Sequence, residues 1–74
     1  MLNMGLLDKR DPLRYEAVVF LGRWYVQRSE YGHYYYMVDR YTQDGKPMWC
    51  FDMEQATQYD YETAHDIVRK LKGE

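Results

Sequence analysis

Cysteine, histidine and carboxylate side chains could supply a nucleophile, a general base or a metal ligand, and the chain holds few candidates. It has one cysteine, Cys50, and two histidines, His33 and His65. Cys50, His65 and Asp66 together have the residue types of a thiol triad. However, Cys50 lies inside an apolar run, where a free cysteine usually packs as a small hydrophobic side chain, and no nucleophile elbow surrounds it. The sequence therefore predicts no catalytic residues.

Metal and phosphate sites need fixed spacings that this sequence lacks. The two histidines and Cys50 form no C-x-x-C or H-x-x-x-H pair of the kind that holds zinc. The five glycines are scattered along the chain, whereas a phosphate or dinucleotide loop needs several of them at close spacing. We therefore predict no metal and no cofactor.

Aromatic and acidic side chains are the abundant functional groups. The 74 residues include nine Tyr, two Trp and two Phe, and no Lys or Arg occurs between Lys46 and Arg69. Tyr is favoured in the desolvated centre of interfaces, and carboxylates around such a centre steer association with a basic partner. The residues predicted to contact a partner are Tyr25, Tyr35, Asp39, Tyr41, Asp52, Glu54 and Glu62.

Nucleic-acid binding is the second interpretation of the aromatic residues. The run from Tyr34 to Tyr36, with Arg23, Arg28 and Arg40 nearby, could stack single-stranded bases. Backbone neutralisation dominates such affinity, and a net charge of −2 does not supply the expected basic field. A cross-strand aromatic ladder that stabilises a sheet would explain the same run without any ligand.

The length and composition predict one domain that rests on packing alone. A chain of 74 residues has room for a single core, and its hydrophobic fraction of 46% predicts folding. No apolar run approaches the length of a membrane span, and one cysteine cannot form an internal disulfide, which suits a reducing cytoplasm. We expect residues 1–11 to be a loosely held N-terminal arm and residues 12–74 to be a single α+β domain.

Three strands are predicted in the middle of the chain. Alternating apolar and polar residues indicate a strand from Arg23 to Arg28, followed by a turn over Ser29 to Gly32. Aromatic and β-branched residues predict the second strand from Tyr34 to Tyr41, and Asp44-Gly45 is a strong hairpin signal. The third strand runs from Met48 to Met53. The result is an antiparallel meander.

The segment from residue 12 to residue 21 fits two structures. Asp11-Pro12 could begin a helix that Gly22 ends, with apolar residues along one face. Against this, Val18-Val19-Phe20 favours a strand. Because Asp11-Pro12 and Gly22 fit the two ends of a helix, we predict a short N-terminal helix.

The C-terminal element is predicted as an amphipathic helix packed on one face of the sheet. Asp60 is a good N-cap, and early acids, late bases and Gly73 agree with the helix dipole and a glycine stop. Ile67 and Leu71 are expected to pack against Trp24, Trp49 and Phe51. The apolar stripe of the helix comprises Tyr61, Ala64, Ile67, Val68 and Leu71.

Alternation divides the predicted strands into two faces. The set without charges is predicted to be the core, namely Trp24, Val26, Tyr36, Val38, Trp49 and Phe51. The opposite set is Tyr25, Gln27, Tyr35, Met37, Asp39, Tyr41, Met48, Cys50 and Asp52. Left open, the second face would be an interaction surface, and the alternative is that residues 12–21 fold back over it.

From Trp24 to Leu71 the chain resembles the small β-meander-plus-helix proteins of phage and prophage genomes, among them anti-CRISPR proteins. The resemblance is carried by Tyr34-Tyr35-Tyr36-Met37-Val38-Asp39-Arg40, Gly45-Lys46-Pro47, Trp49-x-Phe51-Asp52-x-Glu54-x-Ala56 and the terminal helix. It implies a non-catalytic inhibitor in the host bacterial cytoplasm that occupies a basic site on a defence or regulatory protein, such as a CRISPR-Cas complex, and it assigns no functional residue. The expected partner is thus a protein with a basic surface, and copies of the chain could also pair through an edge strand.

Overall fold

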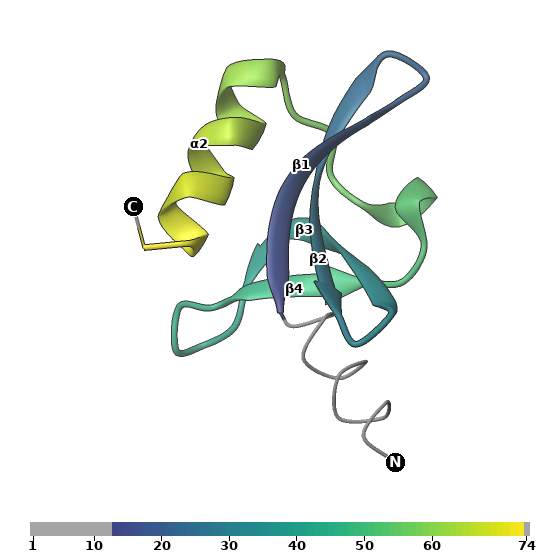
Figure 1. Cartoon of the computed structure of the whole chain (residues 1–74). Helices are drawn as coiled ribbons and strands as arrows, with labels where there is room; N and C mark the ends of the chain where they lie inside the picture. Colours follow the sequence, from purple (N-terminus) through teal and green to yellow (C-terminus); the bar gives the residue numbers. More distant parts are fainter. Residues whose placement is uncertain (1–12, 74) are drawn as a thin grey trace.

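The computed structural model describes residues 13–73 and shows an antiparallel sheet with a helix beside it (Figure 1). The strands lie in chain order, β1-β2-β3-β4. The α+β class and the C-terminal helix are confirmed, and the sheet has one strand more than predicted. The expected arm, residues 1–11, lies outside the described residues. The elements are β1 (Arg14–Phe20), β2 (Arg23–Glu30), β3 (His33–Tyr41), β4 (Pro47–Cys50), the short 3₁₀ helix η1 (Met53–Gln55) and α2 (Tyr61–Leu71).

The added strand is β1, so the predicted short helix over residues 12–21 is wrong. β1 pairs with β2 along its whole length, from Phe20 opposite Arg23 to Arg14 opposite Ser29. Gly22 does not end a helix. It forms with Leu21 a two-residue turn with positive φ at both positions, 53° and 76°, which is the signature of a type I′ hairpin. β1 is therefore an edge strand in the plane of the sheet and does not fold over either face.

The turn between β2 and β3 places the side chains of β3 on the opposite faces from those predicted. Tyr31 and Gly32 form a second two-residue turn with positive φ, so Glu30 pairs with His33 and Gln27 with Tyr36. Met37 in turn lies opposite Trp49. Because this register differs by one residue from the expected one, every side chain of β3 changes face. Met37 belongs to the core, and Tyr36 and Val38, which were predicted there, point to the other side.

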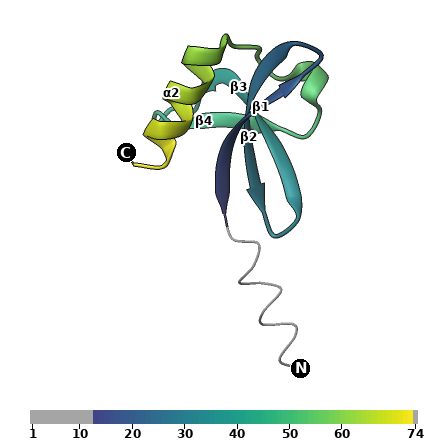
Figure 2. The same ribbon diagram turned by 45° about the horizontal axis from the view of Figure 1, so that its top comes forward.

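The segment after η1 closes the gap where β2 and β3 diverge. The Thr57 N–H donates to the Met37 carbonyl at 3.1 Å, and the Tyr59 N–H donates to the Trp24 carbonyl at 2.9 Å. The Asp39 N–H donates to Thr57 Oγ1 at 2.7 Å. Residues 57–59 thus lie between the diverging ends of β2 and β3, and the sheet is curled. α2 and η1 lie on different sides of the sheet (Figure 2).

The core lies between the sheet and α2. Trp24 and Tyr25 point to opposite faces, and α2 packs on the side of Trp24. Ala64 and Val68 are the buried residues of α2, whereas Ile67 and Leu71 are half-buried, and Phe51 is 75% exposed, contrary to its predicted core position. The buried core cluster is Val26, Met37, Ala64 and Val68.

Asp60 begins α2 as predicted, and its carboxylate accepts a hydrogen bond from the Thr63 N–H at 2.7 Å. Hydrogen bonding from Thr63 holds the pKa of Asp60 below its usual value. A depressed carboxyl pKa contributes stability at neutral pH that is lost as the pH falls below about 4. We expect Asp60→Asn, which keeps a capping oxygen but cannot titrate, to melt below the parent at pH 7 and to match it at about pH 2. A melting difference that is the same at both pH values would contradict this role.

Candidate functional site

The residues considered for catalysis do not meet. Cys50 on β4 is half-buried, and its Sγ lies 3.2 Å from the Asp52 carbonyl oxygen. His65 on α2 bonds through Nδ1 to the Tyr61 carbonyl at 2.8 Å, and its ring packs on Trp24 at a centroid distance of 5.1 Å. Within residues 13–73, no group of three His, Cys, Asp or Glu side chains is placed to hold a metal ion.

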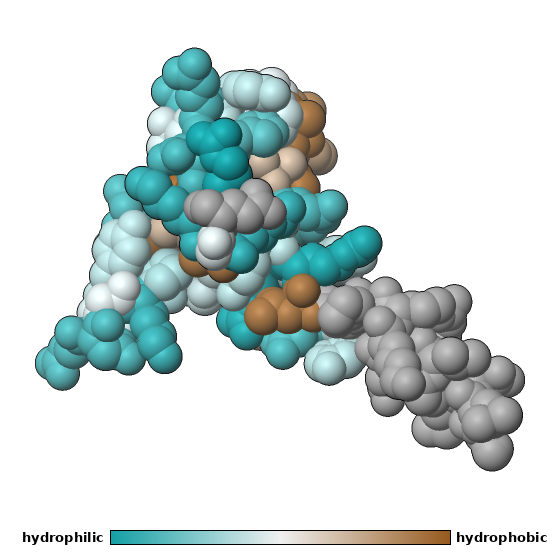
Figure 3. Space-filling model, turned by 60° about the vertical axis from the view of Figure 1, so that its left-hand side comes forward, coloured by the Kyte–Doolittle hydropathy of each residue, from teal (hydrophilic) through white to brown (hydrophobic). Residues whose placement is uncertain are grey.

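The tip of the β1–β2 hairpin forms a groove with the chain around η1. We call it the hairpin-tip groove; its volume is about 270 Å³. Phe20 is 54% exposed and Leu21 is 83% exposed. In Figure 3, hydrophobic side chains gather at the upper right of the molecule, the end that holds this hairpin tip. The groove is lined by Phe20, Leu21, Arg23, Tyr25, Met53, Glu54 and Gln58.

Leu21 is a residue type that its turn does not favour. The first position of a type I′ turn requires positive φ and selects Asn, Asp or Gly. A branched aliphatic residue in the left-handed region costs roughly 1 to 2 kcal/mol. The exposed Leu21 side chain recovers little of this through packing, since it remains in water. The fold alone therefore does not explain a leucine at this position.

Three of the predicted contact residues lie at or beside the hairpin-tip groove. Glu54 lines its wall, and Asp52 accepts a hydrogen bond from the Glu54 N–H at 2.9 Å as the cap of η1. Tyr25 forms the floor but is only 5% exposed, because the η1 segment covers its side of the sheet. Tyr25 therefore supports the groove and does not offer a free surface.

The other predicted contact residues lie apart from this groove. Tyr35 packs on Phe51 at a centroid distance of 5.0 Å and lies under the Arg28 guanidinium at 5.5 Å. Asp39 and Tyr41 lie near Tyr59. Burial raises the pKa of the Tyr59 hydroxyl, and electrostatic repulsion from Asp39 and Tyr41 raises it further. Glu62 is exposed on the first turn of α2. The seven residues therefore do not form one surface.

A second concave surface surrounds Arg28. Its guanidinium lies 5.5 Å from the Tyr35 ring and 5.8 Å from the Trp49 ring, and it forms an ion pair with Glu30 at 3.0 Å. The ring centroids of Tyr15 and Trp49 are 6.0 Å apart across the curled sheet. The groove beside these residues measures about 560 Å³ and is lined by Tyr15, Arg28, Thr42, Asp44, Lys46, Pro47, Trp49 and Leu71.

Sequence reasoning missed Phe20 and Leu21, which are the exposed centre of the hairpin-tip groove. A signal was present, because Leu21-Gly22 separates two β-favouring runs by two residues, and glycine suits the second position of a type I′ turn. Asp11-Pro12, which is typical of a helix start, favoured a helix over this hairpin.

No family model, curated protein or solved structure matches this chain. Within residues 13–73, no helix is both long enough and apolar enough to cross a membrane.

Proposed function

We propose that this protein is a non-catalytic, inhibitor-type binding protein that docks on another protein through the hairpin-tip groove. One observation carries the proposal: Leu21 is 83% exposed in a turn position that disfavours leucine, and it lines a groove beside the exposed Phe20. Tyr31 has the same position in the β2–β3 turn, but it is 56% exposed and its ring ends in a polar hydroxyl. An apolar side chain that is presented to water at a conformational cost has its simplest use in a partner's pocket, where burial returns the hydrophobic free energy. Phe20 beside it enlarges the apolar contact.

The charges around the hairpin-tip groove support a partner with a basic site. Arg23 also lines the groove, but Glu54 on its wall and Asp52 beside it outnumber this one base. Both acids belong to a stretch between Lys46 and Arg69 that has no Lys or Arg. Such carboxylates would form the rim of the interface around the Phe20 and Leu21 centre. A host defence or regulatory protein whose basic site normally holds nucleic acid, such as a CRISPR-Cas complex, has the required chemistry. Occupying that site would block its own ligand.

A captured partner provides the test of this proposal. After affinity capture from bacterial lysate, the protein should raise the apparent Kd of the partner for its nucleic-acid ligand in competition. A partner that binds both molecules at once, with unchanged affinities, would show that the protein is not an inhibitor of this kind.

The rim carboxylate should act mainly on the association rate. We expect Glu54→Lys to slow association several-fold and to weaken its salt dependence, because a rim charge steers the encounter and contributes little to the final complex. Glu16→Lys is the matched control, since Glu16 is also exposed but lies four residues along β1 from Phe20, about 13 Å away. Equal slowing by both variants would indicate an effect of net charge and not of this site.

The Arg28 groove favours a second candidate function, the binding of single-stranded nucleic acid. Trp49 and Tyr15 provide aromatic surface, and Arg28 and Lys46 line the same groove. Stacking with nearby cations is the usual chemistry of such binding. A titration with a single-stranded oligonucleotide at low salt separates the candidates. Salt-sensitive binding that Trp49→Ala abolishes supports the second, and no binding eliminates it.

A further inference from the structure

The outer edge of β1 offers a row of backbone groups to another strand. In the Leu21-Gly22 turn, Phe20 and Arg23 form the hydrogen-bonded pair, and such pairs alternate along an antiparallel ladder. Tyr15, Ala17 and Val19 consequently point their N–H and C=O groups away from β2. Within residues 13–73, these outward groups make no hydrogen bond.

The two edges of the sheet differ in their protection. β4 is four residues long and begins with Pro47, and a bulge between Val38 and Tyr41 interrupts its pairing with β3. Short strands, proline and bulges all discourage pairing with another chain. β1 is seven residues long and has neither proline nor a bulge in its ladder. Its outer edge is suited to strand addition.

We propose that the protein forms a symmetric dimer in which β1 of one copy pairs antiparallel with β1 of a second copy, with the two-fold axis at Ala17. This register joins Ala17 to its own counterpart and joins Tyr15 to Val19 of the other copy in both directions. All three outward-pointing residues of each strand are used, so the two edges satisfy each other.

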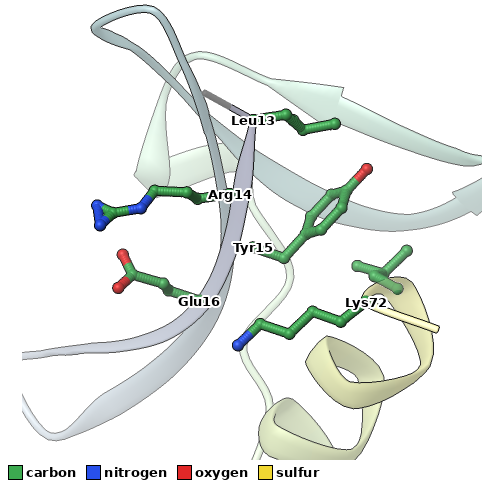
Figure 4. Close-up of a pocket in the computed structure, with 6 residues that line it drawn as sticks. Leu13, Arg14, Tyr15, Glu16 and Lys72 are labelled. Atoms are coloured by element: carbon green, nitrogen blue, oxygen red, sulfur yellow. The ribbon is translucent and has the colours of Figure 1, made fainter. Parts of the chain in front are cut away.

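Side chains across the proposed ladder also match in this register. Val19 is 54% exposed and would lie opposite the Tyr15 ring, which is a favourable β-branched and aromatic pair. On the other face, Arg14 would lie opposite Phe20 and Glu16 opposite Val18, so no like charges face each other. Figure 4 shows this division, with Arg14 and Glu16 pointing to one side of β1 and Tyr15 to the other. A shift of the axis to Glu16 would place two carboxylates face to face, which is destabilising.

α2 contacts both strands of the hairpin and packs on the face that carries the Tyr15 and Ala17 side chains. The proposed pairing uses backbone groups in the plane of the sheet and not the side chains of that face. One strand pair is a small interface, and small interfaces form concentration-dependent complexes. Phe20 takes part in both proposed contacts, whereas the dimer does not require Leu21, which belongs to the turn. Leu21 variants therefore test partner binding, and Ala17 variants test the dimer.

Sedimentation equilibrium over a wide concentration range tests the dimer with the full chain. We expect reversible dimerisation in the parent and a monomer for Ala17→Pro, because proline removes the central outward N–H and is tolerated at an edge. A parent that stays monomeric at the highest concentration would overturn the proposal, and so would an Ala17→Pro protein that folds and dimerises like the parent.

Disulfide trapping tests the register without proline. In a Cys50→Ser background, Ala17→Cys should cross-link readily, because paired Cα atoms about 5.5 Å apart suit a disulfide. Val19→Cys should cross-link poorly, because in this register each Val19 lies opposite Tyr15 and far from its counterpart. Val19 is the more exposed of the two positions. Stronger trapping at Val19 would therefore indicate random collision or another register, and would contradict the proposal.

Discussion

Leu21→Asn is expected to make the protein more stable and to weaken the partner binding proposed for the hairpin tip. Asparagine tolerates positive φ, so the strain of the β1–β2 turn should be relieved by roughly 1 kcal/mol, which raises the melting temperature of a domain of this size by about 4 to 8 °C. The same change deletes the apolar centre of the hairpin-tip groove. Loss of such an anchor costs about 2 kcal/mol or more, or at least about a 25-fold weaker Kd.

Tyr31→Asn is the matched control for this prediction. Tyr31 is also the first residue of a two-residue turn, with φ 49°, and it is 56% exposed at the β2–β3 hairpin. Its substitution should stabilise the fold in the same way and leave partner affinity unchanged. Thermal melts and titration calorimetry on both variants make the comparison. Full affinity in a folded Leu21→Asn protein would place the interface elsewhere.

Met37→Ala should cause a large loss of stability. Met37 is 2% exposed and contacts the core that Val26, Ala64 and Val68 form. Truncating a buried methionine leaves a cavity and costs roughly 2 to 5 kcal/mol, which approaches the total that a domain of this length retains. We expect the urea midpoint to fall steeply, with much of the protein unfolded at 37 °C.

Val38→Ala provides the comparison, because Val38 is the next residue of β3 and points to the other face. It is half-buried, so its truncation should cost only roughly 1 kcal/mol. The face assignment from the sequence alone predicts the opposite order, with Val38 in the core. A Val38 variant that is the less stable of the two would mean that the register of β3 described above is wrong.

The parts of the fold that the sequence predicted correctly are those with local signals. Asp60 caps α2, and Asp44-Gly45 lies in a tight loop in which the Thr42 N–H donates to the Lys46 carbonyl at 2.8 Å. Both features are decided within a few residues. The face of β3 was not predictable in this way, because the position of the turn at Tyr31-Gly32 sets it and a shift of one residue inverts the strand.

The candidate site was less predictable than the fold. Glu54 and Asp52 were chosen for their charge, and both lie at or beside the hairpin-tip groove. Tyr25 was chosen for its residue type, but the η1 segment, which is distant in sequence, buries it. Leu21 has no charged, polar or reactive group that would mark it as a site residue in the sequence. Its interest arises from exposure combined with positive φ, and neither can be known before the hairpin is placed.

Photo-crosslinking in cells tests the central claim, that the hairpin tip is the partner-binding surface, most directly. Leu21 and Tyr31 are replaced one at a time by p-benzoylphenylalanine, so two exposed turn positions of the same geometry are compared. Irradiation should yield one discrete adduct with another protein from position 21 and none from position 31. An adduct from position 31 alone, or none from position 21 when the captured partner is still bound, would contradict the claim.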